Sequence, residues 1–253
     1  MRISNKVWKN YIKRLKDIDD KAASLISAYL RSHVIDDSIS LARLISYSYG
    51  IAQKYGEGSA ALAAQMYDAI AMLSDAYVPP AVPAQPATYN ETARAVQGAR
   101  IFSKNPDVVA SAVGRLVKQA GVDTTMQNAL RDGAEWAWIP SGDTCAFCLT
   151  LASRGWQKAS KNALKNGHAE HIHNNCDCTY AIRFNDGTEV DGYDPDEYYD
   201  MYKSQPGSPN QKINAMRRQI YAQNKERINA QKRSAYAKRK ELNSSEAEEM
   251  DIK

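Results

Sequence analysis

The sequence lacks any long apolar run. None of its stretches approaches the roughly 18 apolar residues that cross a bilayer, so we expect no contact with a membrane. The N-terminal residues MRISNKVWKNYIKRLKDIDD lack the apolar core of a secretory leader, which favours a protein that is made and kept in a cytosol. Hydrophobic residues make up 43% of the chain and charged residues 25%, which is ordinary for a soluble protein with a sizeable core.

The common catalytic signatures are also missing. The sequence contains no GxSxG, no HExxH and no glycine-rich phosphate loop, which argues against the enzyme classes that depend on them. A catalytic zinc would need a nearby base, for which Glu170 is the candidate, and Cys145 or Cys148 with His173 could form a nucleophile pair. The same cysteines and histidine make a fuller set of metal ligands, and a metal-bound thiolate is a poor nucleophile. We therefore favour a protein without catalytic activity.

Cysteine is scarce and confined to one region. The four cysteines lie between positions 145 and 178, and two of the four histidines come just before the second cysteine pair. In a reducing compartment, clustered cysteines bind metal more often than they form disulfides. The segments CAFC at 145–148 and HIHNNCDC at 171–178 would together supply sulfur and imidazole ligands, the combination that suits a tetrahedral zinc ion. We therefore predict a zinc site.

The predicted site has more donors than a tetrahedral ion needs. Cys145 and Cys148 are the firmest ligands, because a Cys-x-x-Cys turn lets two thiolates hold one ion. The His-x-x-Cys at 173–176 fits a single turn, but Cys178 or His171 could replace either of its donors, and the last two cysteines could also serve without a histidine. The fourth ligand is therefore open. The predicted metal ligands are Cys145, Cys148, His173, Cys176 and Cys178.

Apolar residues recur at helical spacing through the N-terminal part of the chain. We expect helices from about Trp8 to Leu73, with a break or a cap at Gly56 and Gly58. Residues 78–89 hold four prolines, which remove backbone donors and disfavour helix in the preceding residue. This stretch is therefore predicted to be an extended linker or a surface arm.

Helical spacing resumes after the prolines. Asp123 is placed to cap a further helix that runs through Trp136. Past the predicted metal ligands, residues 179–184 are typical of a short strand, and the Asn-Asp-Gly at 185–187 is typical of a hairpin turn into residues 188–190. Some β-structure is therefore expected beside the metal.

The C-terminal part is strongly basic and contains a repeat. Residues 211–242 include ten lysines or arginines and two acids. INAMRRQIYAQNKE, which starts at Ile213, matches INAQKRSAYAKRKE, which starts at Ile228, and this spacing returns to a similar face of a helix. We expect one long, exposed helix whose target is either DNA, bound without sequence preference and in a salt-dependent way, or another protein.

These features predict a mainly α protein with a small α+β module stapled by zinc and a long C-terminal helix. They also predict four parts along the chain. The parts are an N-terminal helical region (1–77), a proline-rich linker (78–90), a helical region with the Cys/His metal-binding module (91–205) and a basic, repeat-containing helical tail (206–253).

Four segments carry a resemblance to a known family. They are GEGSAALAAQMYDAI (56–70), QAGVDTTMQNALRDGAEWAWIPSGDTCAFCLTLASRG (119–155), IHNNCDCTYAIRF (172–184) and DGYDPDEYYDMY (191–202). Together they resemble the MuF-like minor head proteins of tailed bacteriophages over about residues 40–205. The block TCAFCLTLASRG with the HxxCxC that follows it is the most specific part. The five predicted donors match the Cys/His pattern of that family, although Asn174, Asn175 and Asp177 depart from it.

The resemblance implies a structural minor capsid protein that is present in few copies and enters the head during assembly. The implied partners are the portal protein and other head proteins, with a role in DNA packaging or ejection as a further expectation. The implied location is the virion, inside the capsid or near the portal, after synthesis in the cytoplasm of the bacterial host. Members of the family are often described as capsid maturation proteases, so a prohead protease is the alternative function, although the sequence shows no catalytic triad.

Overall fold

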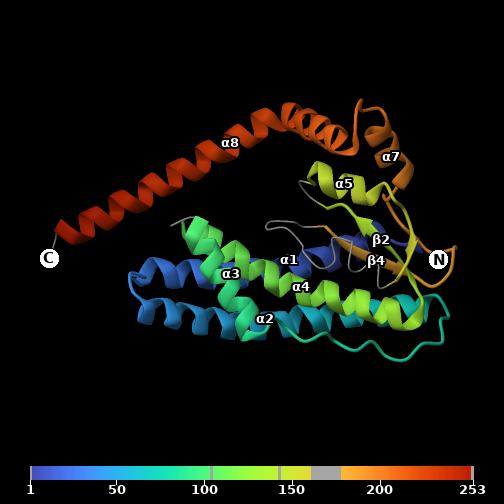
Figure 1. Cartoon of the computed structure of the whole chain (residues 1–253), viewed down its shortest axis with the longest axis horizontal. Helices are drawn as coiled ribbons and strands as arrows, with labels where there is room; N and C mark the ends of the chain where they lie inside the picture. The colour runs from blue at the N-terminus through green and yellow to red at the C-terminus, as the bar shows by residue number, and fades with distance from the viewer. Residues whose placement is uncertain (1, 103–104, 142–143, 161–177, 252–253) are drawn as a thin grey trace.

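The computed structural model of the protein describes residues 2–102, 105–141, 144–160 and 178–251. It shows a mainly helical fold with small sheets, which confirms the predicted fold class in its helical part (Figure 1). Within these ranges, the helices lack an apolar stretch of the length that spanning a bilayer requires. The helices are α1 (Asn5–Ser32), α2 (Ser38–Leu73), α3 (Tyr89–Phe102), α4 (Pro106–Asp132), α5 (Ala146–Ala152), α7 (Pro195–Lys203) and α8 (Pro209–Asp251). The strands are β1 (Arg2–Ile3), β2 (Glu135–Ile139), β3 (Gln157–Lys158), β4 (Thr179–Arg183) and β5 (Glu189–Val190).

Helices α1, α2 and α4 lie side by side, with α3 against α2 and α4, and form the helical body (Figure 1). Asp37 caps α2, because its carboxylate accepts the backbone N–H of Ser40 at 2.6 Å. α2 and α4 approach closely at Gly121, where a Cβ atom would lie 2.6 Å from the Oγ of Ser59. Glycine therefore sets the distance between α2 and α4. Fully buried side chains of the body include Ile26, Leu44, Val96 and Val113.

The predicted break at Gly56 and Gly58 is wrong, because α2 runs without interruption from Ser38 to Leu73. A glycine in a helix interior costs about 1 kcal/mol relative to alanine, an amount that tertiary packing can offset. Gly56 lies against residues 76–88, which we call the proline arm, and a Cβ atom there would lie 2.8 Å from the Cβ of Pro86. This glycine makes room for the arm instead of ending a helix.

The helix predicted to start at Asp123 is also wrong. α4 continues past this residue, whose carboxylate accepts a hydrogen bond from Gln119 of the same helix at 2.8 Å. α4 ends at Gly133, which has a left-handed φ of 66°. Trp136, predicted as helical, lies in strand β2. Both faces of this strand are buried, so its sequence shows no alternation of polar and apolar residues that would have indicated a strand.

The central sheet is antiparallel, with strand order β3-β2-β4. β4 confirms the predicted strand, but the predicted hairpin is wrong, because β5 pairs in parallel with β1 and places Ile3 opposite Val190. The turn itself forms, since the N–H of Thr188 donates to the carbonyl of Asn185 at 3.3 Å, but it directs the chain to the N-terminal strand. One hydrophobic cluster joins the helices to both sheets; it includes Ile3, Trp8, Tyr67, Ile139 and Ile182.

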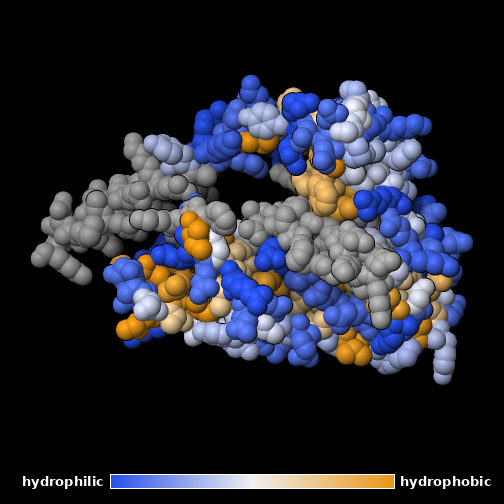
Figure 2. All heavy atoms as spheres, in the orientation of Figure 1, coloured by the Kyte–Doolittle hydropathy of each residue, from blue (hydrophilic) through white to orange (hydrophobic). Residues whose placement is uncertain are grey.

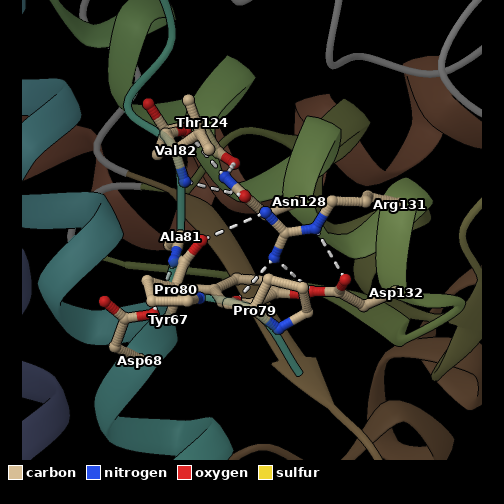
Figure 3. A network of polar contacts seen from close by, with 10 residues as sticks. All are labelled: Tyr67, Asp68, Pro79, Pro80, Ala81, Val82, Thr124, Asn128, Arg131 and Asp132. Carbon is tan, nitrogen blue, oxygen red and sulfur yellow. Dashed lines mark hydrogen bonds and ion pairs between the residues drawn. The ribbon is translucent and has the colours of Figure 1, made fainter.

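The proline arm lies along the helical body and is bound by side chains of α4 (Figure 3). Asn128 donates from Nδ2 to the carbonyl of Val82 at 2.9 Å, and its Oδ1 accepts the N–H of Val82 at 2.9 Å. Thr124 Oγ1 accepts the N–H of Ala84 at 2.9 Å. Backbone groups of an extended segment need partners when they leave water. The side chains of α4 supply these partners in place of a neighbouring strand.

Arg131 fixes the start of the arm by donating to the carbonyls of Pro79 at 2.8 Å and Pro80 at 3.1 Å (Figure 3). It also forms an ion pair with Asp132 at 2.7 Å, and Asp132 accepts the hydroxyl of Tyr67 at 2.8 Å. Burial raises the pKa of Asp132, but the hydrogen bonds from Arg131 and Tyr67 outweigh it and hold the pKa below its usual range. The arm, α2 and α4 are thereby joined at one end.

α8 confirms the predicted long C-terminal helix, and its proximal part is docked. Met216 is fully buried in a cluster with Leu149 of α5, and Ile213 and Ile220 of α8 pack against the same cluster. Past this contact, α8 runs on above the helical body in the view of Figure 1, and its C-terminal end lies beyond the end of the body. We call residues 229–251 the distal α8.

Candidate metal centre

Cys145 and Cys148 lie at the start of α5. Cys145 is the N-cap residue of this helix, and its Sγ accepts a hydrogen bond from the backbone N–H of Cys148 at 3.5 Å. Cys148 is buried and Cys145 is half-buried. A backbone donor of this kind stabilises negative charge on sulfur, and the short turn lets both side chains reach one ion.

Cys178 immediately precedes β4 and lies beside the same turn. Its Sγ is 3.7 Å from the Oγ1 of Thr144, the residue that precedes Cys145. The pairing of β2 with β4 explains this proximity, because Ile139 at the end of β2 lies opposite Thr179. The fold thus brings three of the five predicted ligands to one end of the central sheet.

The three cysteines border a cluster of aromatic side chains. Trp136 and Trp138 of β2 pack edge-on against Tyr180 of β4, with ring centroids 4.7 Å and 4.5 Å apart. Cys148 and Cys178 belong to this buried cluster. A thiolate in such an apolar setting is costly unless a cation compensates its charge. The surroundings therefore suit either neutral thiols or thiolates that hold a metal ion.

The donor chemistry fits zinc, but the described part of the predicted set is incomplete. Thiolates are the ligands that structural zinc sites use most. Among the residues that the structure describes, no group of three or more His, Cys, Asp or Glu side chains is placed to hold a metal ion. His173 and Cys176, and the alternative ligand His171, lie outside the described residues. The full ligand set stays a prediction.

The catalytic alternatives depend on the same segment of the chain. Glu170, the candidate base of an open zinc site, and His173, the candidate partner of a cysteine nucleophile, both lie outside the described residues. Cys148 is fully buried, which is unfavourable for a nucleophile that must reach a substrate. Both catalytic alternatives stay hypotheses.

The sequence did not indicate a groove that lies beside the cysteines. It has a volume of about 630 Å³ and runs between α5, α7 and α8, where Figure 2 shows a hollow. Cys145 lines one side, and Tyr198 and Met201 of α7 line another. Burial raises the pKa of Tyr198, and the nearby charge of Glu197 raises it further. The helical spacing of Tyr198, Met201 and Tyr202 is the one sequence signal that could have identified this wall.

The region from β1 to α7 matches a known protein family. The family model described as VG15 protein matches residues 2–205, which include the helical body, the proline arm and the strands. No curated protein and no solved structure matches the chain. The family match ends between α7 and α8, so α8 lies outside it. Because the match covers well over half of its length, the chain belongs to the VG15 protein family, a family of viral proteins.

Proposed function

We propose that this protein is a structural minor head protein of a tailed bacteriophage, of the MuF-like type, which joins the head beside the portal during assembly. The observation that carries this proposal is the match to a viral protein family over residues 2–205. The four segments that resemble MuF-like proteins lie within the same residues. They include Gly56, where α2 contacts the proline arm, and the Cys-x-x-Cys turn.

A zinc ion in this protein would have a structural role. Cys145, Cys148 and Cys178 would supply thiolates, and His173 or Cys176 would complete the set. A zinc ion with four protein ligands joins distant parts of the chain and leaves no position for a reacting water. Support comes from the three cysteines at one end of the central sheet and from the chemistry of the donors. The ion would tie α5 to β4.

The helical body offers a surface for protein partners such as the portal. Val34, Ile39 and Ile101 are 79%, 62% and 81% exposed. They lie at one end of the body, because Arg100 of α3 donates to the carbonyl of Ile35 in the α1–α2 connection at 2.7 Å. Grouped exposed apolar side chains mark contact surfaces more often than chance. Packaged DNA is a further candidate contact for the lysines and arginines of residues 211–242.

A phage that carries a stop codon in this gene tests the proposal. Infectious yield should fall, because heads lack a portal-proximal component, whereas the intact mass of the major capsid protein should match that of wild type. Supplying the wild-type chain from a plasmid should restore the yield.

Two outcomes would contradict the proposal. An unchanged yield without the chain would remove its role in assembly. A capsid protein that remains unprocessed without the chain, and is processed when the chain is supplied, would identify a prohead protease instead.

A further inference from the structure

α8 contains two copies of one sequence motif, and the fold uses them differently. The first copy begins at Ile213 and packs Met216 and Ile220 against α5 and α7. The second copy begins at Ile228 and lies almost entirely on the distal α8, where residues 230–234 are exposed. The surface of α5 and α7 thus already accepts one copy of the motif, whereas the other copy extends into solvent (Figure 1).

Two tyrosines and the two lysines between them share one face of α8. The members of this stripe are Tyr221, Lys225, Lys232 and Tyr236. Their spacing keeps them within about 60° around the helix axis. Tyr221 is 46% exposed and Tyr236 is 72% exposed. In the part of the chain that the structure describes, no acid forms an ion pair with Lys225, Lys232 or Arg233. The stripe therefore suits a partner that presents carboxylates beside apolar side chains.

α7 has the complementary composition. Tyr198 and Met201 on its inner face pack against the cluster that holds α8. Asp196, Glu197 and Asp200 are exposed and share its outer face, since residues three and four apart are neighbours on a helix. Within the described residues, these three carboxylates form no ion pair. Like charges at this spacing repel one another, so a cationic partner would stabilise this face.

α7 cannot meet the basic end of its own α8. In the described part of the chain, the two helices pack together around Ile213 and Ile220, and the groove that they share extends along α8 to Ile228. The carboxylates lie on the outer face of α7, turned away from this groove, and Lys232 lies beyond the groove on one continuous helix. The carboxylates of α7 and the cations of the distal α8 can therefore pair only between two copies of the chain.

We propose that the distal α8 of one copy docks on α7 of a second copy. Lys232 and Arg233 of the distal α8 face the carboxylates on the outer face of α7. The contact joins two different surfaces, so it is head-to-tail and builds a ring or an open chain of copies. Duplex DNA would satisfy the lysines but would leave the carboxylates of α7 without cations, which is why a second copy is the better match. This association does not depend on the proposed function.

Charge reversal on each side provides the test. The tail variant carries Lys232→Glu with Arg233→Glu, and the α7 variant carries Glu197→Lys with Asp200→Lys. In analytical ultracentrifugation of the full chain at low salt, wild type should associate as its concentration rises, and each variant alone should remain monomeric. An equal mixture of the two variants should associate again, because the reversed tail then meets the reversed α7 and the native tail meets the native α7.

A matched control carries Lys9→Glu with Lys13→Glu on the exposed side of α1, which changes the net charge as the tail variant does. It should associate like wild type, and circular dichroism should show the same helix content in all variants. A wild-type chain that stays monomeric at low salt, or a mixture that fails to associate, would overturn the proposal. If wild type does not self-associate but binds unrelated duplex DNA, and the tail variant loses that binding, then the target of the tail is DNA and the proposal is wrong.

Discussion

The proline arm and the distal α8 are opposites in how they are held. The arm is not helical and contains four prolines, yet Asn128 and Thr124 bind its backbone and Ala84 is buried. The distal α8 is regularly helical, yet the side chains described at residues 230–234 are exposed. In these two regions, therefore, the irregular backbone is fixed by tertiary contacts, and the regular backbone extends into solvent.

The family match follows the same division. Residues 2–205 contain the arm and the three described cysteines, and α8 lies beyond them. Substitutions of buried or hydrogen-bonded residues within the matched region should therefore lower the free energy of unfolding. Changes in the distal α8 should leave that free energy nearly constant and affect only association.

Cys148→Ser should have the largest effect on stability. If Cys148 binds zinc as proposed, its loss should lower the free energy of unfolding by about 3 kcal/mol or more, since metal binding is then part of the folding free energy. Thermal melting measures the loss of stability, and elemental analysis of the purified protein measures the loss of zinc. Chelation of wild type should raise hydrogen exchange in β2, β4 and α5 before it does so in α1, α2 and α4. The zinc proposal would be wrong if the purified wild-type protein contained no metal and if a chelator did not change its melting temperature.

Asn128→Ala should have the next largest effect. It leaves the N–H and the carbonyl of Val82 without their partner, which should cost about 2 kcal/mol in urea unfolding. Limited proteolysis should then cut residues 76–88 faster. Gln127→Ala is the matched control, because Gln127 is an exposed neighbour on the same helix, and it should change neither measurement. Equal losses from both variants would show that the arm is not held by Asn128.

Asp132→Asn should have a smaller, pH-dependent effect. The folded pKa of Asp132 lies below its ordinary value of 3.8, so its contribution is present above pH 3.8 and is lost as pH falls through the folded pKa. The variant should lose about 1 kcal/mol at neutral pH, because Arg131 then faces a neutral amide. The difference from wild type in urea unfolding should shrink as the solution is acidified. A difference that stays constant down to low pH would contradict the assigned ion pair.

Removal of the distal α8 should have the smallest effect on stability. The free energy of unfolding of a chain that ends at Ile228 should differ by no more than about 0.5 kcal/mol from that of the full chain, as is usual for changes at exposed sites. Thermal unfolding measures this difference, and ultracentrifugation of the same sample reports the loss of association. A large fall in stability would show that the distal α8 packs on the body in solution.

The sequence predicts the elements that are encoded by neighbouring residues, and it does not predict the features that depend on contacts between distant residues. The repeat within residues 213–241 predicts the long α8, and the Asn-Asp-Gly turn that follows residues 179–184 helps to predict the strand β4. Trp136 was assigned to a helix because both faces of β2 are buried, so alternation is absent. Gly56 was assigned to a break because its partner, Pro86, lies far away in sequence.

In the candidate site, too, the sequence predicts local features and misses those that depend on distant elements. Spacing alone identified the cysteines, because a Cys-x-x-Cys turn is a local feature. The groove beside Cys145 depends on α7 and α8 returning to α5, and no short segment encodes that return. The same reason explains why the sequence could not show that Asn128 and Arg131 bind the proline arm.

The central claim, that this is a structural minor head protein, is tested most directly by quantitative mass spectrometry of purified virions. We predict that peptides from the matched region and from α8 are both present, in far fewer copies than the major capsid protein and in a constant ratio to the portal protein. A chain that is found in the lysate of infected cells but is absent from purified particles would contradict the claim.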